Sequence, residues 1–353
     1  MVSLGSHGYV QTLKGQTLKG QTLRFPNLAL PMKDWPKGLN PHCDDLQTVQ
    51  HTEVKKLVGE GKAYNIYVST DCPYFAALFP ERQLGTGAAG IANLYLWDDA
   101  IDSPELTDLG KDLDASNRLR QETKKHAERY LRDEPLLGFV TNARLSPAVR
   151  SLDPIGETVA FRMPRGQRVQ VSNELERYID GCAVEQLSEL SGRAPTIEEY
   201  LQWRMGTSRV GFVLACLEYI LGIDLGDTIR NDEYVKVVFD ETVFNIAIVN
   251  DILSLRRELR YPFYNNAVAV FYHQHEDLQK AVDETHRLIL RSIEKLEQAV
   301  KRAVERYSER QEDLVTWIDG CKTMCTGNVT WSLYIPRFAL GVEAVDGTTE
   351  ITI

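Results

Sequence analysis

Residues 289–307 read ILRSIEKLEQAVKRAVERY, and this stretch indicates the fold class most clearly. That spacing of apolar residues, at steps of three and four with Glu, Lys and Arg between them, is typical of an amphipathic surface helix. The apolar positions are Ile289, Ile293, Leu296, Val300, Val304 and Tyr307. Less regular helical periodicity marks residues 173–189, 197–220 and 232–259. Because no alternating run of β-branched residues suggests a sheet, we predict an all-α, single-domain protein.

The two ends of the chain differ in composition from this helical part. Residues 11–24, QTLKGQTLKGQTLR, repeat a polar five-residue unit that is too short to form a core, which predicts a mobile tail at 1–24. Residues 25–42 contain four Pro, which interrupt regular helix and favour an extended strap over the surface. Loops are expected near residues 103–110, 163–172 and 222–231.

The bulk composition excludes some classes of protein. A chain of 353 residues, 43% hydrophobic and 25% charged, can bury a substantial core. A net charge of -10 disfavours a nucleic-acid-binding protein, which needs a basic face. No window approaches the roughly 20 apolar residues that span a bilayer, and the first ten residues do not resemble a secretory signal, so we expect a cytoplasmic protein without membrane insertion. The six Cys have no zinc-ligand spacing and are expected to be reduced thiols.

The first cluster that could carry chemistry is WDDAID at residues 97–102. If the small and apolar run before it is helical, Asp98 and Asp102 lie one turn apart on the same helix face. Their carboxylates would present hard oxygen ligands to a common point, which suits Mg²⁺. Acidic clusters at helix ends are also commonly solvated caps or turns, so this motif alone leaves both interpretations open.

The second cluster lies within the helix expected at 232–259. Asn250, Ser254 and Glu258 are spaced i, i+4 and i+8, so an amide oxygen, a hydroxyl and a carboxylate form one stripe along a helix face. A polar surface stripe is the alternative interpretation. However, Ile246 and the apolar residues before it continue the same face, which is typical of a metal site at the mouth of an apolar cavity. Two helices that each offer oxygen ligands could hold a diphosphate through metal ions.

Together these clusters resemble the motifs of class I terpene synthases, in particular the microbial and fungal sesquiterpene cyclases. DDAID at 98–102 looks like the aspartate-rich motif of that family, and the Asn/Ser/Glu stripe looks like its second, NSE-type magnesium triad. Residues 35–42, WPKGLNPH, resemble the N-terminal strap of the fungal enzymes. The resemblance covers roughly residues 25–340, which we expect to form the cyclase domain, and leaves 341–353 as a C-terminal tail. It implies a helical bundle around a central apolar active-site cavity.

A third match is YLQWRMGTS at residues 200–208, which resembles the family segment whose Arg senses the diphosphate. Arg204 lies 46 positions before Asn250, as in the microbial enzymes. Thr207 and Ser208 would match the linker and effector positions that couple sensing to ionisation. The resemblance therefore assigns Arg204 to the diphosphate.

Further matches lie near the end of the resemblance. WSLYIPRF at 331–338 looks like the family's terminal Arg-Tyr pair with its upstream Trp, here Arg337 and Trp331. Arg257 directly precedes Glu258, where the family carries a basic diphosphate ligand. The chain departs from the pattern at Phe338, because the family has Tyr there and the phenolic hydrogen-bond donor is absent.

The resemblance implies an enzyme that uses three Mg²⁺ ions to ionise an isoprenyl diphosphate, expected to be farnesyl diphosphate, and cyclises it to a sesquiterpene hydrocarbon or alcohol. Aromatic faces stabilise carbocations, and Tyr95 and Trp331 are the candidates, with core packing as the alternative. A prenyl diphosphate synthase is disfavoured because its second aspartate-rich motif is replaced by the Asn/Ser/Glu triad. A non-catalytic prenyl-diphosphate-binding helical protein is the other alternative. We expect a monomer or homodimer that binds no nucleic acid.

Overall fold

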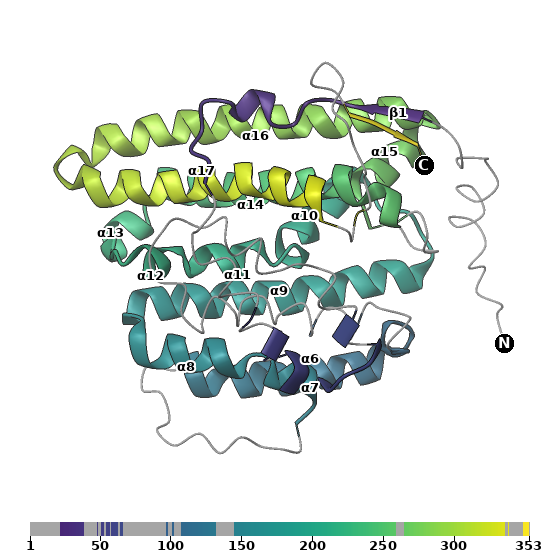
Figure 1. The fold of residues 1–353 in the computed structure, drawn as a ribbon, viewed down its shortest axis with the longest axis horizontal. Helices are drawn as coiled ribbons and strands as arrows, with labels where there is room; N and C mark the ends of the chain where they lie inside the picture. Colours follow the sequence, from purple (N-terminus) through teal and green to yellow (C-terminus); the bar gives the residue numbers. More distant parts are fainter. Residues whose placement is uncertain are drawn as a thin grey trace.

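Long helices run side by side in stacked layers in the computed structural model of the chain (Figure 1). The structure describes residues 22–38, 48, 51–52, 54–56, 58–62, 64–65, 97, 101, 107–131, 145–258, 265–335, 338 and 349–352. Helix dominates these residues, so the prediction of an all-α domain is confirmed.

The helices have the following bounds. The α-helices are α6 (Leu113–Leu131), α7 (Pro147–Arg150), α8 (Asp153–Arg162), α9 (Arg165–Ser191), α10 (Ile197–Thr207), α11 (Val210–Ala215), α12 (Leu217–Leu221), α13 (Gly226–Arg230), α14 (Glu233–Glu258), α15 (Ala267–His275), α16 (Leu278–Arg306) and α17 (Gln311–Tyr334). Short 3-10 helices are η1 (Leu30–Met32), η2 (Leu109–Lys111) and η3 (Ser308–Arg310).

Helix α14 is the central element, because it contacts α10, α11, α15, α16 and α17. Its buried residues lie on several faces, among them Val243 and Ile248, so its apolar periodicity is weak. Helix α16 instead buries one stripe that includes Ile289, Ile293 and Leu296. The amphipathic helix predicted from the opening stretch is therefore confirmed, with its buried stripe facing α14 and α15.

Glycines bring α9 and α10 into close contact. A Cβ atom on Gly206 would lie 2.7 Å from the Arg177 carbonyl oxygen, and one on Gly181 would lie 3.2 Å from the Thr207 nitrogen. Atoms cannot approach that closely without displacement, so only glycine fits at Gly206. This contact fixes the distance of α10, which carries Arg204, from α9.

The prediction of a loop at 163–172 is largely wrong. Only Met163 and Pro164 lie between α8 and α9, because Pro164 is the N-cap of a helix that begins at Arg165. Gly166, which lies inside the predicted loop, permits close packing of α9 and α13. A Cβ there would lie 2.3 Å from side-chain atoms of Asp227 and Arg230 in α13. The loop predicted at 222–231 likewise contains the short helix α13, and the described part of 103–110 enters η2.

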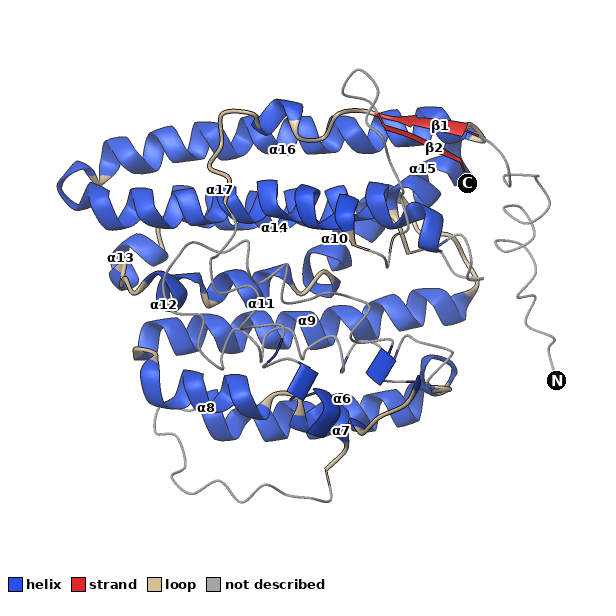
Figure 2. Ribbon diagram, viewed as in Figure 1, coloured by secondary structure: helices blue, strands red, loops and turns tan. Residues whose placement is uncertain are grey.

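A two-stranded sheet joins segments from both ends of the chain, although the sequence predicts no sheet. Strand β1 (Thr22–Phe25) pairs antiparallel with β2 (Thr349–Thr352), with Thr22 opposite Thr352 (Figure 2). Leu23 and Phe25 alternate with exposed neighbours and are buried. Four residues are too few for periodicity to reveal a strand. The segments predicted as tails at 1–24 and 341–353 therefore both contribute residues to this sheet.

The strap expected from the Pro-rich segment lies along α16, with η1 and β1 in contact with that helix (Figure 1). The Trp35 indole donates to Glu297 at 2.5 Å, and the Thr326 hydroxyl donates to the Pro36 carbonyl at 2.7 Å. The strap therefore ties α16 to α17. Within the described ranges, no helix is both long and apolar enough to span a bilayer.

Candidate active site

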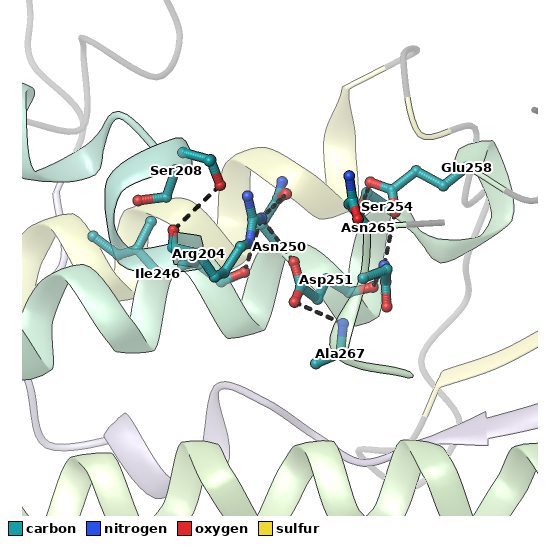
Figure 3. A network of polar contacts seen from close by, with 12 residues as sticks. Arg204, Ser208, Ile246, Asn250, Asp251, Ser254, Glu258, Asn265 and Ala267 are labelled. Atoms are coloured by element: carbon teal, nitrogen blue, oxygen red, sulfur yellow. Dashed lines mark hydrogen bonds and ion pairs between the residues drawn. The ribbon is translucent and has the colours of Figure 1, made fainter. Parts of the chain in front are cut away.

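One face of α14 carries the predicted Asn/Ser/Glu stripe toward the helix C-terminus. The Ser254 hydroxyl donates to Glu258 Oε1 at 2.6 Å, one helical turn away (Figure 3). Ser254 is 1% exposed, whereas Asn250 and Glu258 are half-buried. Because Ser254 directs its proton at Glu258, the lone pairs of its oxygen remain free to accept a cation. Ile246, one turn before Asn250, is buried, so the stripe continues into an apolar face.

Arg204 reaches this stripe from α10. Its Nη2 donates to Asn250 Oδ1 at 3.2 Å and to the Ala247 carbonyl at 3.3 Å, and it forms an ion pair with Asp251 Oδ1 at 2.7 Å (Figure 3). Its Nε is buried and has no hydrogen-bond partner among the described residues. The resemblance assigned Arg204 to the diphosphate and Asn250 to the metal, and the two side chains are in direct contact.

Asp251 is the buried anchor of this contact. Its carboxylate accepts from the Tyr200 hydroxyl at 2.6 Å and from the Ala267 backbone N–H at 3.0 Å, in addition to the Arg204 ion pair. The residue is 1% exposed. Helices α10, α14 and α15 therefore meet at one carboxylate directly behind Asn250.

Burial and charge together set the protonation of this cluster. Burial raises the pKa of Asp251 to about 6, although the Arg204 guanidinium acts in the opposite direction. Burial disfavours the charge on Arg204, but the Asp251 carboxylate outweighs that effect and holds the pKa of Arg204 above its ordinary value. Burial also raises the pKa of Tyr200 well above its usual range. Tyr200 thus remains a hydrogen-bond donor, and Arg204 remains cationic beside Asn250.

The chain breaks its helix directly after Arg204. Helix α10 ends at Thr207, Ser208 is its C-cap, and α11 begins at Val210. Between them Arg209 has φ 61°, a left-handed conformation that a non-glycine residue rarely adopts. Thr207 and Ser208, the predicted linker and effector positions, therefore lie between the guanidinium that contacts α14 and a strained backbone position.

Two other predicted residues, Trp331 and Arg257, are described, and four lie outside the described part. Trp331 is 3% exposed and packs edge-to-face against Phe338 with ring centroids 5.7 Å apart. Arg257 is half-buried in the last turn of α14. Tyr95, Asp98, Asp102 and Arg337 lie outside the described residues. Trp97, from the first motif, is described: its indole donates to the Thr123 hydroxyl at 2.7 Å and packs against Tyr178 of α9.

The donor set suits a hard divalent cation. Asn250 Oδ1, Ser254 Oγ and the Glu258 carboxylate are all oxygen ligands, which Mg²⁺ prefers. Within the described ranges, no group of three His, Cys, Asp or Glu side chains gathers to hold a metal. A metal at this stripe would use the Asn250 amide and Ser254 hydroxyl oxygens beside Glu258. Arg204 donates a hydrogen bond to one lone pair of Asn250 Oδ1, so a metal would bind through the second lone pair of that oxygen.

Sequence reasoning missed two residues of this cluster. Tyr200 begins the quoted motif at 200–208 and Asp251 directly follows Asn250, but neither was assigned a role. A carboxylate between the apolar residues Val249 and Ile252 was an available signal for Asp251, because an ionised side chain is rarely buried without a partner.

The chain is similar to known proteins in family, sequence and structure. A family model described as terpene synthase family 2, C-terminal metal binding, matches residues 91–295. The sesquiterpene cyclase hepA of Aspergillus oryzae is 30% identical over 341 residues, covering 93% of this chain and 92% of the relative. The terpene cyclase braA of Annulohypoxylon truncatum is 25% identical, covering 89% and 85%.

Solved structures share the fold at lower identity. Hedycaryol synthase in complex with nerolidol aligns with a TM-score of 0.69 and 20% identity, covering 84% of this chain and 96% of that structure. A structure of a-eudesmol synthase aligns with a TM-score of 0.72 and 16% identity, covering 85% and 97%. These likenesses support the same helical architecture over nearly the whole of each solved chain.

Proposed function

The chain belongs to the terpene synthase family, and on that premise we propose that it converts farnesyl diphosphate to a cyclic sesquiterpene hydrocarbon or alcohol with release of diphosphate. The family model describes metal binding, and we propose Mg²⁺ as that metal. The sesquiterpene cyclase named among the relatives supports a fifteen-carbon substrate.

The observation that carries this proposal is the contact between Arg204 and the oxygen stripe of α14. Asn250, Ser254 and Glu258 would hold Mg²⁺, which supplies Lewis-acid neutralisation of the departing diphosphate when bound. Arg204 keeps its charge because Asp251 lies 2.7 Å away, and its buried Nε still lacks a partner among the described residues. A diphosphate oxygen would accept from that N–H and gain a charge-assisted hydrogen bond that strengthens as negative charge develops.

The rest of the site would handle the carbocation that ionisation leaves behind. Ile246, one turn before Asn250, would continue the oxygen stripe with an apolar side chain and help to exclude water from the cation. Trp331 and Tyr95 remain the proposed aromatic partners for the hydrocarbon. Thr207 and Ser208 lie between Arg204 and the left-handed Arg209. A shift of Arg204 on diphosphate binding would therefore also move the backbone at the break between α10 and α11.

Two variants of the oxygen stripe test the proposal. Asn250→Ala and Glu258→Ala each delete a metal ligand, so terpene formation, measured by gas chromatography with mass detection, should fall by at least about 100-fold. Asp240→Asn is the matched control, because it removes an exposed carboxylate from the same helix. Circular dichroism should show all three variants folded. Full turnover by Glu258→Ala would remove α14 from the metal site.

A further inference from the structure

Asn266 lies at the point where α15 meets the end of α14, and its side chain is entirely buried at 0% exposure. It is the N-cap of α15: its Oδ1 accepts from the Val268 N–H at 2.8 Å. Its Nδ2 donates to the Asp251 carbonyl at 2.6 Å and to Glu258 Oε2 at 2.8 Å. The Asn266 amide thus caps α15 and donates hydrogen bonds to Asp251 and Glu258 of α14.

Of the three hydrogen bonds of the Asn266 side chain, only the one to Glu258 reaches a predicted metal ligand. Glu258 is the last described residue of α14, and its side chain has three free torsions. The Ser254 hydroxyl bonds to Oε1 and the Asn266 amide bonds to Oε2, so both carboxylate oxygens have a donor. Each oxygen keeps a further lone pair for a cation. The pair of donors therefore sets the orientation of this carboxylate.

The position of Asn266 is itself firmly defined. The next residue, Ala267, donates its backbone N–H to Asp251 Oδ2 at 3.0 Å, and the preceding residue, Asn265, accepts at its carbonyl from the Tyr200 hydroxyl at 3.4 Å. Asn265 also donates its side-chain amide to Glu189 of α9 at 2.7 Å. The start of α15 is therefore bound to α9, α10 and α14, and it presents the Asn266 amide at a fixed place.

We propose that Asn266 is a positioning residue for the metal site: its amide holds the Glu258 carboxylate in the orientation that binds the divalent cation. This inference rests on the proposed function, in which Glu258 is a metal ligand. A residue that affects metal affinity then lies outside the 250–258 motif, at the start of α15. Donors that orient a ligating carboxylate commonly change metal affinity by about 10-fold to 100-fold when they are removed.

The test measures metal binding without turnover. MnCl₂ is titrated into the full chain in the presence of inorganic diphosphate, and free Mn²⁺ is followed by electron paramagnetic resonance. Asn266→Ser keeps a hydroxyl that accepts from Val268 N–H, so it retains the cap, but it is too short to reach Glu258. We expect its Mn²⁺ affinity to be about 10-fold lower than that of the wild type. If this variant does not fold, Asn266→Thr offers the same hydroxyl.

Two further variants separate the possible failures. Asp277→Ala removes the N-cap of α16, which accepts from Lys280 N–H and has no recorded contact with Glu258, so a purely structural loss should leave Mn²⁺ affinity unchanged. Glu258→Ala should weaken Mn²⁺ binding by at least as much as the Asn266 variant does. Wild-type affinity in Glu258→Ala would overturn the proposed metal role of Glu258. Weak binding in Glu258→Ala together with wild-type affinity in the Asn266 variant would overturn the positioning role alone.

Discussion

Replacing Asp251 by Asn should destabilise the protein far more than an equally conservative change at the surface. The substitution keeps the size of the side chain but removes the negative charge 2.7 Å from Arg204. The Tyr200 hydroxyl and the Ala267 N–H can both still donate to the new amide oxygen. The loss of stability therefore comes from Arg204, because its side chain is only 13% exposed and would keep a buried, uncompensated charge.

The magnitude follows from that geometry. Removing one partner of a buried ion pair costs about 3–5 kcal/mol. Arg204 keeps its hydrogen bonds to Asn250 and to the Ala247 carbonyl, which favours the lower end, about 3 kcal/mol. A chain of 353 residues has an unfolding entropy of about 0.7 kcal/mol per kelvin. The expected fall in Tm is therefore about 4 °C.

Differential scanning calorimetry and urea unfolding would measure this loss. The control is Asp240→Asn, also on α14, which breaks an ion pair with Arg177 of α9 at 3.6 Å, where the Asp side chain is 56% exposed. Such a pair contributes less than about 1 kcal/mol. Combining Asp251→Asn with Arg204→Met should cost less than the sum of the single changes, because both charges are then gone. An Asp251→Asn variant no less stable than Asp240→Asn would refute the argument.

Three other outcomes are expected. Arg204→Ala should lower kcat by on the order of 10²-fold in steady-state assays, since its contact with diphosphate strengthens in the transition state; a change in KM alone would contradict this. Farnesyl diphosphate should have a higher kcat/KM than geranyl or geranylgeranyl diphosphate, and a clear preference for either of those would show the substrate proposal to be wrong. Gly206→Ala should lower stability by about 1–3 kcal/mol in urea unfolding, because its Cβ would meet the Arg177 carbonyl oxygen at 2.7 Å; unchanged stability would mean that α10 can shift freely.

The sequence predicts well whatever depends on a single helix. Periodicity is enough to place Asn250, Ser254 and Glu258 on one face of α14, because 3.6 residues per turn determine which positions are neighbours. The same reasoning identifies the buried stripe of α16. The contact between Arg204 and Asn250 joins two helices, so it could be expected only from the resemblance to a known family.

Contacts between distant segments leave little trace in a sequence. Thr22 and Thr352 meet across the two-stranded sheet although 330 positions separate them, and each strand has only four residues. Residues 163–172 were expected to form a loop, yet Gly166 within them is helical and lets α13 approach α9. The bond from Asn266 to Glu258 likewise depends on how α15 returns to α14. Each case depends on tertiary packing, which overrides the local preference.

The most direct test of the proposed reaction is to incubate the purified full chain with farnesyl diphosphate and MgCl₂ and to identify the products by gas chromatography with mass detection. We expect a cyclic fifteen-carbon hydrocarbon or alcohol with one diphosphate released per product, no turnover in excess EDTA, and recovery when Mg²⁺ is restored. Full turnover in the presence of EDTA would contradict it, as would a longer diphosphate as the only product when isopentenyl diphosphate is also supplied.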